Sequence, residues 1–214
     1  MIPPVPFITL EGIEGSGKST QMRLLRDAYG ERILLTQEPG GTALGVAIRA
    51  ILLDRKHHEM TATTELLLYL ADRAQHVESL VRPALERGLT VISDRYLETT
   101  FAYQGYGRGI PAETIETLGR IATGGLRPDL IVLLDVPVEV GLARVGKRGI
   151  HDRLEAEVRE FHERVRAGYQ QLVRDAPERW LVVDGTRAWS WIHDQIVAEC
   201  ARRGLLPQGA HGVR

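Results

Sequence analysis

A segment near the N-terminus has the residue types and spacing of a phosphate-binding loop. Glycines there would let successive backbone N–H groups converge on phosphate oxygens, because a Cβ atom would block the close approach. Lys18 would supply a mobile positive charge for the β and γ oxygens of a nucleotide, and the Ser19 hydroxyl could bind Mg²⁺. The segment satisfies the pattern GxxxxGK[ST] and continues to Thr20, as Gly12-Ile13-Glu14-Gly15-Ser16-Gly17-Lys18-Ser19-Thr20.

The surroundings of this segment favour phosphate binding over a glycine-rich surface turn, which is the structural alternative. An apolar run, residues 7–11, precedes it, and a helical pattern begins at Lys18. The N-terminus of that helix would add its positive dipole end to the loop amides. We therefore predict that the chain binds a nucleoside triphosphate.

Other charged residues suggest what happens to the bound phosphates. Asp94 and Arg95 follow an apolar run, and Arg148 and Arg153 lie in a basic segment, about residues 146–153, between two helical patterns. The structural alternatives are an ion pair at a strand end and a solvated basic turn. A phosphate acceptor is already anionic near neutral pH, so it needs cations more than a general base. The excess of arginines over candidate bases thus favours phosphoryl transfer to a nucleoside monophosphate.

These residues must be positioned by the elements between them. Short apolar runs alternate with helical patterns, which predicts a doubly wound α/β fold with helices on both faces of a parallel sheet. Ligands of such folds bind at the carboxyl ends of the strands. The expected architecture is the three-layer αβα sandwich of P-loop NTPases with a five-stranded parallel sheet. The strand candidates are residues 7–11, 33–37, 90–93, 130–135 and 180–184; the helical patterns cover 18–29, 43–53, 63–87 with a break near Pro83, 112–122, 138–147, 154–175 and 188–203.

Length and composition describe an ordinary globular chain. Its length of 214 residues suits one domain, residues 1–204 with a lid at about 146–153, followed by a tail, 205–214, and its net charge is -1. The near-neutral charge argues against a nucleic-acid partner, and the apolar runs are too short to cross a membrane. The one cysteine, Cys200, and the absence of a recognisable signal peptide favour the cytoplasm.

Three classes of phosphate-binding protein remain to be compared: a small-molecule kinase, a GTP-dependent switch and a binding module without turnover. A switch is disfavoured because the chain has no NKxD-type tetrapeptide. A regulatory ATP-binding module stays an alternative that an assay can test. Among kinases, the alternative to a monophosphate kinase is a deoxynucleoside kinase, whose 5′-hydroxyl acceptor would require a carboxylate base.

Taken in order, the motifs of the chain resemble those of bacterial thymidylate kinases, over about residues 5–200. The likeness lies in their serial order, since apart from the phosphate-binding loop each motif is weak alone. The matching segments are FITLEGIEGSGKST at 7–20, EPGGT at 38–42, Ile48-Arg49, ADRAQ at 71–75, Asp94-Arg95-Tyr96, AYQG at 102–105, Arg127-Pro128-Asp129 and Asp152-Arg153-Leu154-Glu155.

The resemblance implies transfer of the γ-phosphoryl group of ATP to dTMP, with Mg²⁺, in a protein that is typically a homodimer. It implies a role for each matching residue. Lys18, Asp94, Arg95, Arg148 and Arg153 would act in catalysis, with Asp94 and Ser19 near the metal and Arg95 on the acceptor phosphate. Glu14 would reach the sugar 3′-hydroxyl, and Tyr103 would pack against C2′ and exclude a ribose. Arg49, Tyr69, Arg73, Thr99, Thr100 and Gln104 would complete the acceptor site.

Some implied roles have structural alternatives. Tyr69 and Arg73 are four residues apart and would share one helix face, where the resemblance places them on the thymine base. Alternatively, Tyr69 packs in the core while Arg73 extends to solvent. Thr99 and Thr100 could instead cap a helix.

The chain departs from the family pattern in three places. Gln37 stands where many relatives have arginine, and Arg49 could compensate for it. Threonine replaces the serine that is common after Asp94-Arg95-Tyr96. The residues from Gly204 onward lie outside the pattern. Thymidylate kinases differ in where they carry the arginine that stabilises the transition state; the phosphate-binding loop here holds none, so Arg148 and Arg153 are the candidates.

Overall fold

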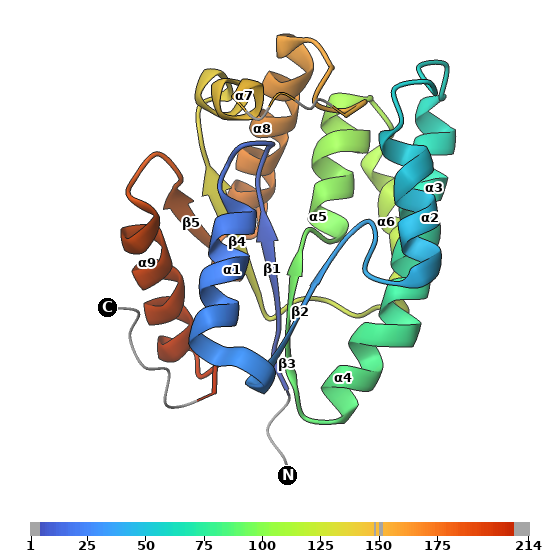
Figure 1. Ribbon diagram of the computed structural model, residues 1–214. Helices are drawn as coiled ribbons and strands as arrows, with labels where there is room; N and C mark the ends of the chain where they lie inside the picture. The colour runs from blue at the N-terminus through green and yellow to red at the C-terminus, as the bar shows by residue number, and fades with distance from the viewer. Residues whose placement is uncertain (1–4, 148, 150–151, 208–214) are drawn as a thin grey trace.

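The chain folds around a central sheet in which strands and helices alternate (Figure 1). The structure is a computed structural model that describes residues 5–147, 149 and 152–207. The five strands lie where the apolar runs predict them. They are β1 (Phe7–Glu11), β2 (Ile33–Gln37), β3 (Thr90–Asp94), β4 (Leu130–Asp135) and β5 (Trp180–Asp184).

All strand pairs in the sheet are parallel, and the strand order is β2-β3-β1-β4-β5. Leu10 of β1 is level with Asp94 of β3 on one side and with Val132 of β4 on the other. The carboxyl ends of the middle strands therefore meet at one edge. The chain fills the sheet on one side of β1 with β2 and β3 and then on the other side with β4 and β5. Such a change of side opens a crevice at the carboxyl ends of the strands, where these sheets bind ligands.

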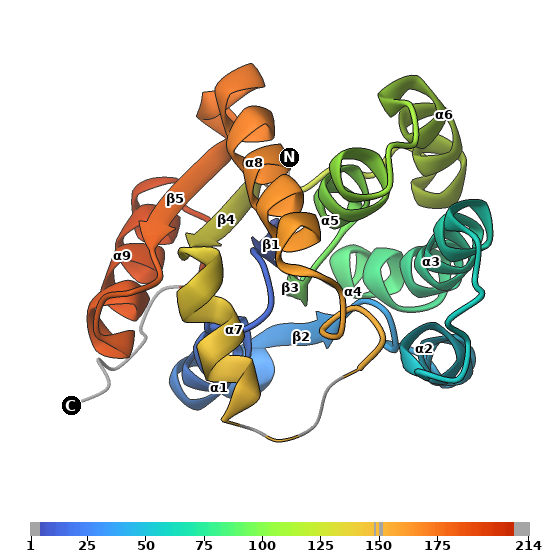
Figure 2. The same cartoon turned by 90° about the horizontal axis from the view of Figure 1, so that it is seen from above.

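Helices cover both faces of the sheet, which confirms the expected three-layer architecture (Figure 2). On one face, α1 and α9 bury Met22, Leu25 and Ile192 against the middle strands. On the other face, α8 buries Phe161 and Val165. The helices are α1 (Lys18–Tyr29), α2 (Ala43–Leu53), α3 (Ala62–His76), α4 (Arg82–Glu86), α5 (Leu97–Thr100), α6 (Ala112–Thr123), α7 (Val138–Gly146), α8 (Arg159–Asp175) and α9 (Trp189–Arg202).

Two helical segments differ from the sequence prediction. No helix was expected between β3 and residue 112, yet α5 lies there and continues into a π-helical segment, Phe101–Gly107. Its glycines weaken the helical pattern, but Gly107 is required because a Cβ there would lie 2.7 Å from the Phe161 ring of α8. The helix expected from residue 154 begins at Arg159, since the Asp152 carboxylate accepts the N–H groups of Leu154 and Glu155 in a turn.

The break expected near Pro83 takes the form of a π-helical segment, Val77–Val81, between α3 and α4. Proline has no N–H to donate to the preceding turn, and its ring crowds that turn. At the other end of the chain, Leu205 and Leu206 of the expected tail pack against the core beside α9. Residues 208–214 lie outside the described residues.

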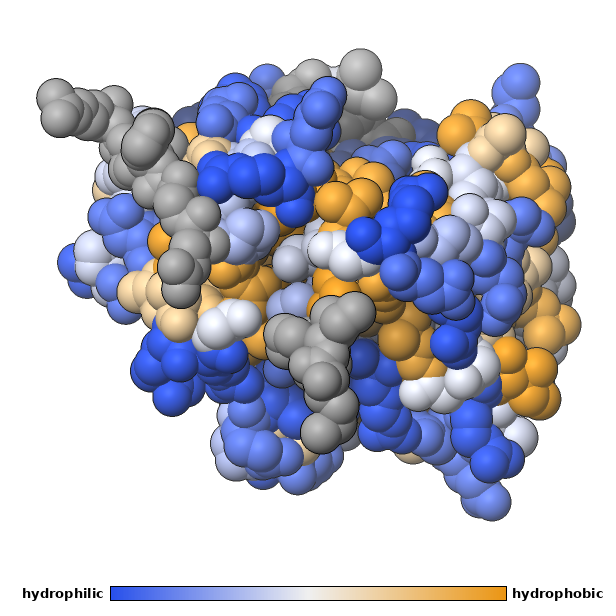
Figure 3. Space-filling view, turned by 90° about the horizontal axis from the view of Figure 1, so that it is seen from below, coloured by the Kyte–Doolittle hydropathy of each residue, from blue (hydrophilic) through white to orange (hydrophobic). Residues whose placement is uncertain are grey.

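The face at the amino ends of the strands mixes hydrophobic and hydrophilic residues (Figure 3). Within the described part of the chain, no helix has the length and apolar character needed to cross a bilayer.

Candidate active site

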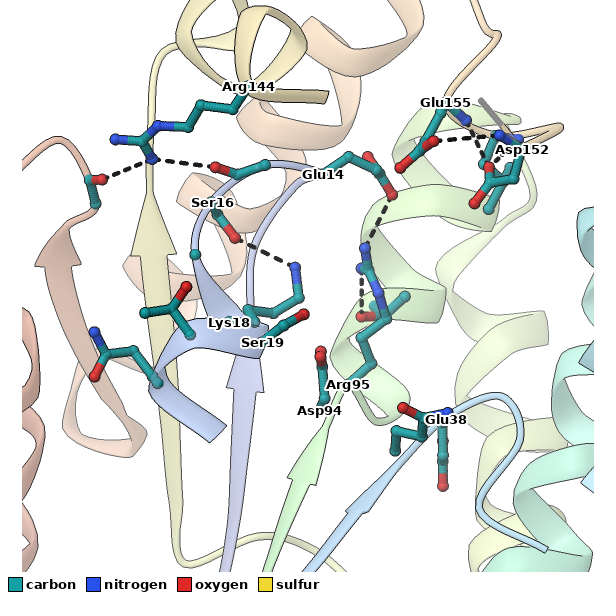
Figure 4. A pocket seen from close by; sticks show the side chains of 18 of the residues that line it. Glu14, Ser16, Lys18, Ser19, Glu38, Asp94, Arg95, Arg144, Asp152 and Glu155 are labelled. Carbon is teal, nitrogen blue, oxygen red and sulfur yellow. Dashed lines mark hydrogen bonds and ion pairs between the residues drawn. The ribbon is translucent and has the colours of Figure 1, made fainter. Parts of the chain in front are cut away.

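A pocket of about 580 Å³ opens at the carboxyl ends of β1 and β3 (Figure 4). It joins segments that are far apart in the sequence: the loop before α1, the ends of β2 and β3, and the beginning of α9. Most predicted site residues line it, namely Glu14, Gly15, Ser16, Gly17, Lys18, Ser19, Thr20, Arg49, Tyr69, Asp94, Arg95, Thr99 and Tyr103.

The loop between β1 and α1 has the backbone shape of an anion cradle. Gly12, Gly15 and Gly17 all have positive φ, at 136°, 71° and 105°. A Cβ on Gly12 would lie 2.6 Å from the carbonyl oxygen of Leu134, and one on Gly15 would collide with the carbonyl of Gly141. Only glycine fits these positions, which leaves the loop amides and the N-terminus of α1 facing the pocket.

Lys18 is folded back onto this loop. Its Nζ donates to the carbonyl oxygens of Gly12 at 2.8 Å and Ile13 at 3.1 Å, and to Ser16 Oγ at 3.3 Å. Burial, together with the nearby positive charge of Arg95, lowers the pKa of Lys18 to about 8. A phosphate chain in the cradle would supply the negative charge that these neutral carbonyls cannot.

Arg95 faces the loop from the end of β3. Its φ of 77° is a left-handed conformation that costs energy for a residue with a Cβ. The backbone is held there because Arg95 N–H donates to Leu10 and its carbonyl accepts from Ser93 Oγ. The guanidinium donates to Glu14 Oε1 at 2.9 Å and lies 5.0 Å from the centre of the Tyr103 ring. Neighbouring Tyr103 and Glu14 raise its pKa against the effect of burial.

Glu14 is the anionic centre of the pocket. The Tyr103 hydroxyl lies 2.6 and 2.7 Å from its two oxygens, and Arg95 pairs with it (Figure 4). Burial would raise the pKa of this carboxyl, but nearby His162 and the charges of Arg95 and Lys18 hold it well below its usual range. Glu14 is therefore an ionised acceptor placed between the cradle and Arg95.

Ser19 and Asp94 provide oxygen atoms suited to a magnesium ion bound with phosphates. Both line the pocket close to Lys18, and Asp94 Oδ1 is buried without a hydrogen-bond partner among the described residues. Those residues hold no cluster of three or more His, Cys, Asp or Glu side chains for a metal. Magnesium in phosphate sites needs few protein ligands, because waters and phosphate oxygens fill its octahedron. The residues present thus fit this ion.

Sequence reasoning did not single out three residues that lie after β4 and β5 at the pocket. Arg144 of α7 donates to the carbonyl oxygens of Gly15 at 3.1 Å and Gly185 at 3.0 Å, and so joins the phosphate-binding loop to the end of β5. Arg187 and Trp189 line the pocket where α9 begins. The signal was available: each follows a strand whose carboxyl end points at the binding edge.

Comparisons with known proteins show which proteins this chain is similar to. Residues 10–196 match the family model described as Thymidylate kinase. The thymidylate kinase of Geobacter sp. (strain M21) is 51% identical, with 97% of this chain and 96% of the relative covered. That of Desulfovibrio desulfuricans is 47% identical, with 91% and 92% covered. The crystal structure of thymidylate kinase from Ehrlichia chaffeensis superposes with a TM-score of 0.76 at 31% identity, covering 93% of this chain and 100% of that chain.

The chain belongs to the thymidylate kinase family. The resemblance found in the motifs is confirmed, and so is the expectation of a thymidylate kinase, an enzyme that phosphorylates a nucleoside monophosphate. Its P-loop fold with a five-stranded parallel sheet is the family fold.

The other predicted site residues that the structure describes fall into two groups. Arg49, Tyr69, Thr99 and Tyr103 line the pocket with Arg95. Gly12, Ile13, Arg73, Thr100, Gln104 and Arg153 do not line it in this structure.

Arg49 lies beside the segment that follows Gln37. Its Nη1 donates to the carbonyl oxygen of Pro39 at 2.8 Å, and Gln37 itself lines the pocket. The Arg49 side chain thus supports the loop after β2 at the rim of the pocket.

Arg73 is fully buried rather than extended to solvent, the alternative weighed for it. It pairs with Glu38 at 2.7 Å and donates to Thr100 Oγ1 at 2.8 Å and to the Tyr96 carbonyl at 2.9 Å. Tyr69, one turn earlier on α3, belongs to the hydrophobic core and also lines the pocket. The core and substrate interpretations of Tyr69 are therefore compatible.

Thr99 and Thr100 lie inside α5 and make no cap, so the capping alternative is wrong. Thr99 Oγ1 donates to Glu11 Oε2 at 2.5 Å and lies 2.9 Å from the Tyr169 hydroxyl. Glu11 also accepts the N–H of Tyr96. Burial, with a smaller contribution from nearby Glu98, raises the pKa of Glu11 to about 8.

Arg153 and Gln104 meet at a different carboxylate. Glu65 of α3 pairs with Arg153 Nη2 at 2.6 Å, accepts from Gln104 Nε2 at 2.9 Å and pairs with Arg108. Arg153 lines a smaller neighbouring cavity. Arg148, the other candidate of the predicted lid, lies outside the described residues.

Proposed function

We propose that this chain transfers the γ-phosphoryl group of Mg-ATP to dTMP, giving dTDP and ADP. The observation that carries the proposal is the joint placement of the phosphate cradle and Arg95 on opposite sides of one pocket, with Glu14 between them. Two polyanions can approach there only because cations and amides face both of them. The resemblance supplies the identity of the acceptor.

The donor side uses the loop from Gly12 to Thr20. Its amides and the N-terminus of α1 would hold the β-phosphate, and Lys18 would leave the carbonyls of Gly12 and Ile13 to follow the γ-phosphoryl group. Ser19 and Asp94 would hold Mg²⁺, the latter through its water shell. That ion, when bound, supplies neutralisation of the charge shared by the β- and γ-phosphates.

On the acceptor side, Arg95 would turn from Glu14 to the phosphate of dTMP, which presents anionic oxygens to a guanidinium fork. Glu14, released from Arg95, would accept the 3′-hydroxyl. The Tyr103 ring would lie against C2′ and leave no space for a 2′-hydroxyl. Tyr69 would stack on the base, whose polar edge would meet Arg73, Thr99, Thr100 and Gln104.

We propose that an arginine of the lid stabilises the transition state. Arg153 could supply it only by leaving Glu65, with which it pairs at 2.6 Å. The lid, about residues 146–153, would then close over ATP and exclude water before transfer. Arg148 is the second candidate for this role.

We also propose that the enzyme acts as a homodimer in the cytoplasm. Large apolar side chains are exposed on adjacent helices: Leu44 and Ile51 on α2, Leu67 on α3 and Ile121 on α6, the last at 74%. A second copy would cover them. The single thiol, Cys200, supports the cytoplasmic location. Burial raises its pKa to about 12, which keeps the thiol protonated and unreactive toward disulfide formation. Sedimentation velocity of the wild type and of Ile121→Lys tests the dimer.

The test of the function is a coupled ADP-release assay with dTMP and with thymidine as acceptors. The proposal expects turnover with dTMP and none with thymidine. Turnover with thymidine alone would establish the deoxynucleoside kinase instead. Lack of turnover with every monophosphate tried would favour the regulatory ATP-binding module.

A further inference from the structure

His162 of α8 is a buried side chain whose surroundings do not account for it. It is 1% exposed, and neither ring nitrogen has a hydrogen-bond partner within the described part of the chain. A buried polar group without a partner costs about 1–3 kcal/mol, so such a group calls for an explanation. The neighbouring Phe161 ring lies edge-on to the imidazole, with 5.6 Å between ring centres.

The polar group that His162 faces is Glu14. Its Nδ1 lies 3.6 Å from Glu14 Oε2, which is an ion-pair distance but longer than a hydrogen bond. A movement of less than about 1 Å would turn this contact into a hydrogen bond from Nδ1–H to the carboxylate, even with a neutral imidazole. In the structure this movement is unnecessary, because Arg95 and Tyr103 already satisfy Glu14.

Substrate binding would change that balance. If Arg95 turns to the acceptor phosphate, Glu14 loses its guanidinium partner while it remains buried. A buried carboxylate that loses its counterion is costly unless another donor replaces it. His162 of α8 can replace it, because its Nδ1 faces the Glu14 carboxylate at 3.6 Å and no substrate role is assigned to it.

We propose that His162 is a positioning residue. It would donate a hydrogen bond from Nδ1–H to the Glu14 carboxylate when Arg95 binds the acceptor phosphate, and so orient that carboxylate toward the sugar 3′-hydroxyl. This inference rests on the proposed function, which assigns the 3′-hydroxyl to Glu14. Its consequence is that His162 acts on acceptor binding only through that hydroxyl.

The experiment combines His162→Phe with a change in the substrate. Phenylalanine keeps an aromatic ring and removes both nitrogens; kcat and KM are measured with dTMP and with its 3′-deoxy analogue, which lacks the hydroxyl. We expect a rise of about tenfold in the KM for dTMP, the effect of about one hydrogen bond to a charged group, with kcat changed less than about twofold. With the 3′-deoxy analogue the variant and the wild type should have the same KM.

Matched variants separate positioning from structure. His162→Asn, whose Nδ2 takes the approximate place of Nδ1, should recover most of the KM for dTMP. His193→Phe is the control, because His193 of α9 is also a buried histidine with an unpartnered Nδ1, and it should leave KM unchanged. Should His162→Phe not fold, His162→Leu gives the same comparison of substrates.

The inference is overturned by an unchanged KM for dTMP in the variant, or by an equal rise in KM for both acceptors. Equal KM values of the wild type for both acceptors would also overturn it, since the hydrogen bond from the 3′-hydroxyl to Glu14 would then contribute nothing to binding. Failure of the proposed function looks different, because the wild-type enzyme itself would not turn over dTMP.

Discussion

Removing the guanidinium of Arg95 should impair the use of dTMP far more than the binding of ATP. The guanidinium donates to Glu14 at 2.9 Å, and this fork is the group we assign to the acceptor phosphate. A hydrogen bond to a charged group contributes about 1.5–3 kcal/mol, so losing two such bonds to phosphate removes about 3–6 kcal/mol. At about 1.4 kcal/mol per factor of ten, Arg95→Ala should lower kcat/KM for dTMP by about 10²–10⁴.

The coupled ADP-release assay gives kcat/KM for dTMP, and calorimetry with a non-hydrolysable ATP analogue gives the donor Kd, which should change less than about threefold. Arg95→Gly is the matched variant: it loses the same contacts but suits the φ of 77°, so it should be about 1 kcal/mol more stable than Arg95→Ala. Equal losses for both nucleotides would refute the assignment, and greater stability of the alanine variant would refute the strain at this position.

Three further variants test other parts of the site. Lys18→Ala should abolish most phosphoryl transfer while the melting temperature stays within a few degrees of wild type; a collapse of the fold would show a structural role. Arg153→Ala should lower kcat more than it raises KM, because its contact should strengthen in the transition state, and a pure KM effect would contradict this. Glu11 has a pKa of about 8 in the folded chain against 4.5 when unfolded, so the folded state binds more protons between these values and loses stability as pH rises through them. Urea denaturation at pH 5.5 and 8 should show that loss in the wild type and much less of it in Glu11→Gln; the same loss in both would mean that other groups cause it.

The sheet and the phosphate cradle could be predicted because their signals are local. Each strand is a short apolar run, and the cradle combines glycines with a lysine at fixed spacing. The segment Phe101–Gly107 could not be predicted in this way, because its π-helical form depends on packing against Phe161, more than fifty residues later.

The partners of the charged site residues were also beyond the sequence. Sequence reasoning places Arg73 and Arg153 near phosphates or a base, but it cannot tell which acids they meet in the fold. In the structure these are Glu38 and Glu65. Arg144 shows the converse, because a residue with no motif of its own joins the cradle to β5 through two backbone carbonyls.

The ion pair between Arg95 and Glu14 has a consequence for small anions that are not substrates. The Glu14 carboxylate already pairs with the guanidinium, so inorganic phosphate or sulfate would have to displace it. The displaced carboxylate would then be buried without its cationic partner. A nucleotide that brings both an anion for the arginine and a hydroxyl for the glutamate satisfies the two groups together. If the acceptor binds at Arg95 as we propose, the pair would disfavour the binding of inorganic phosphate and sulfate there.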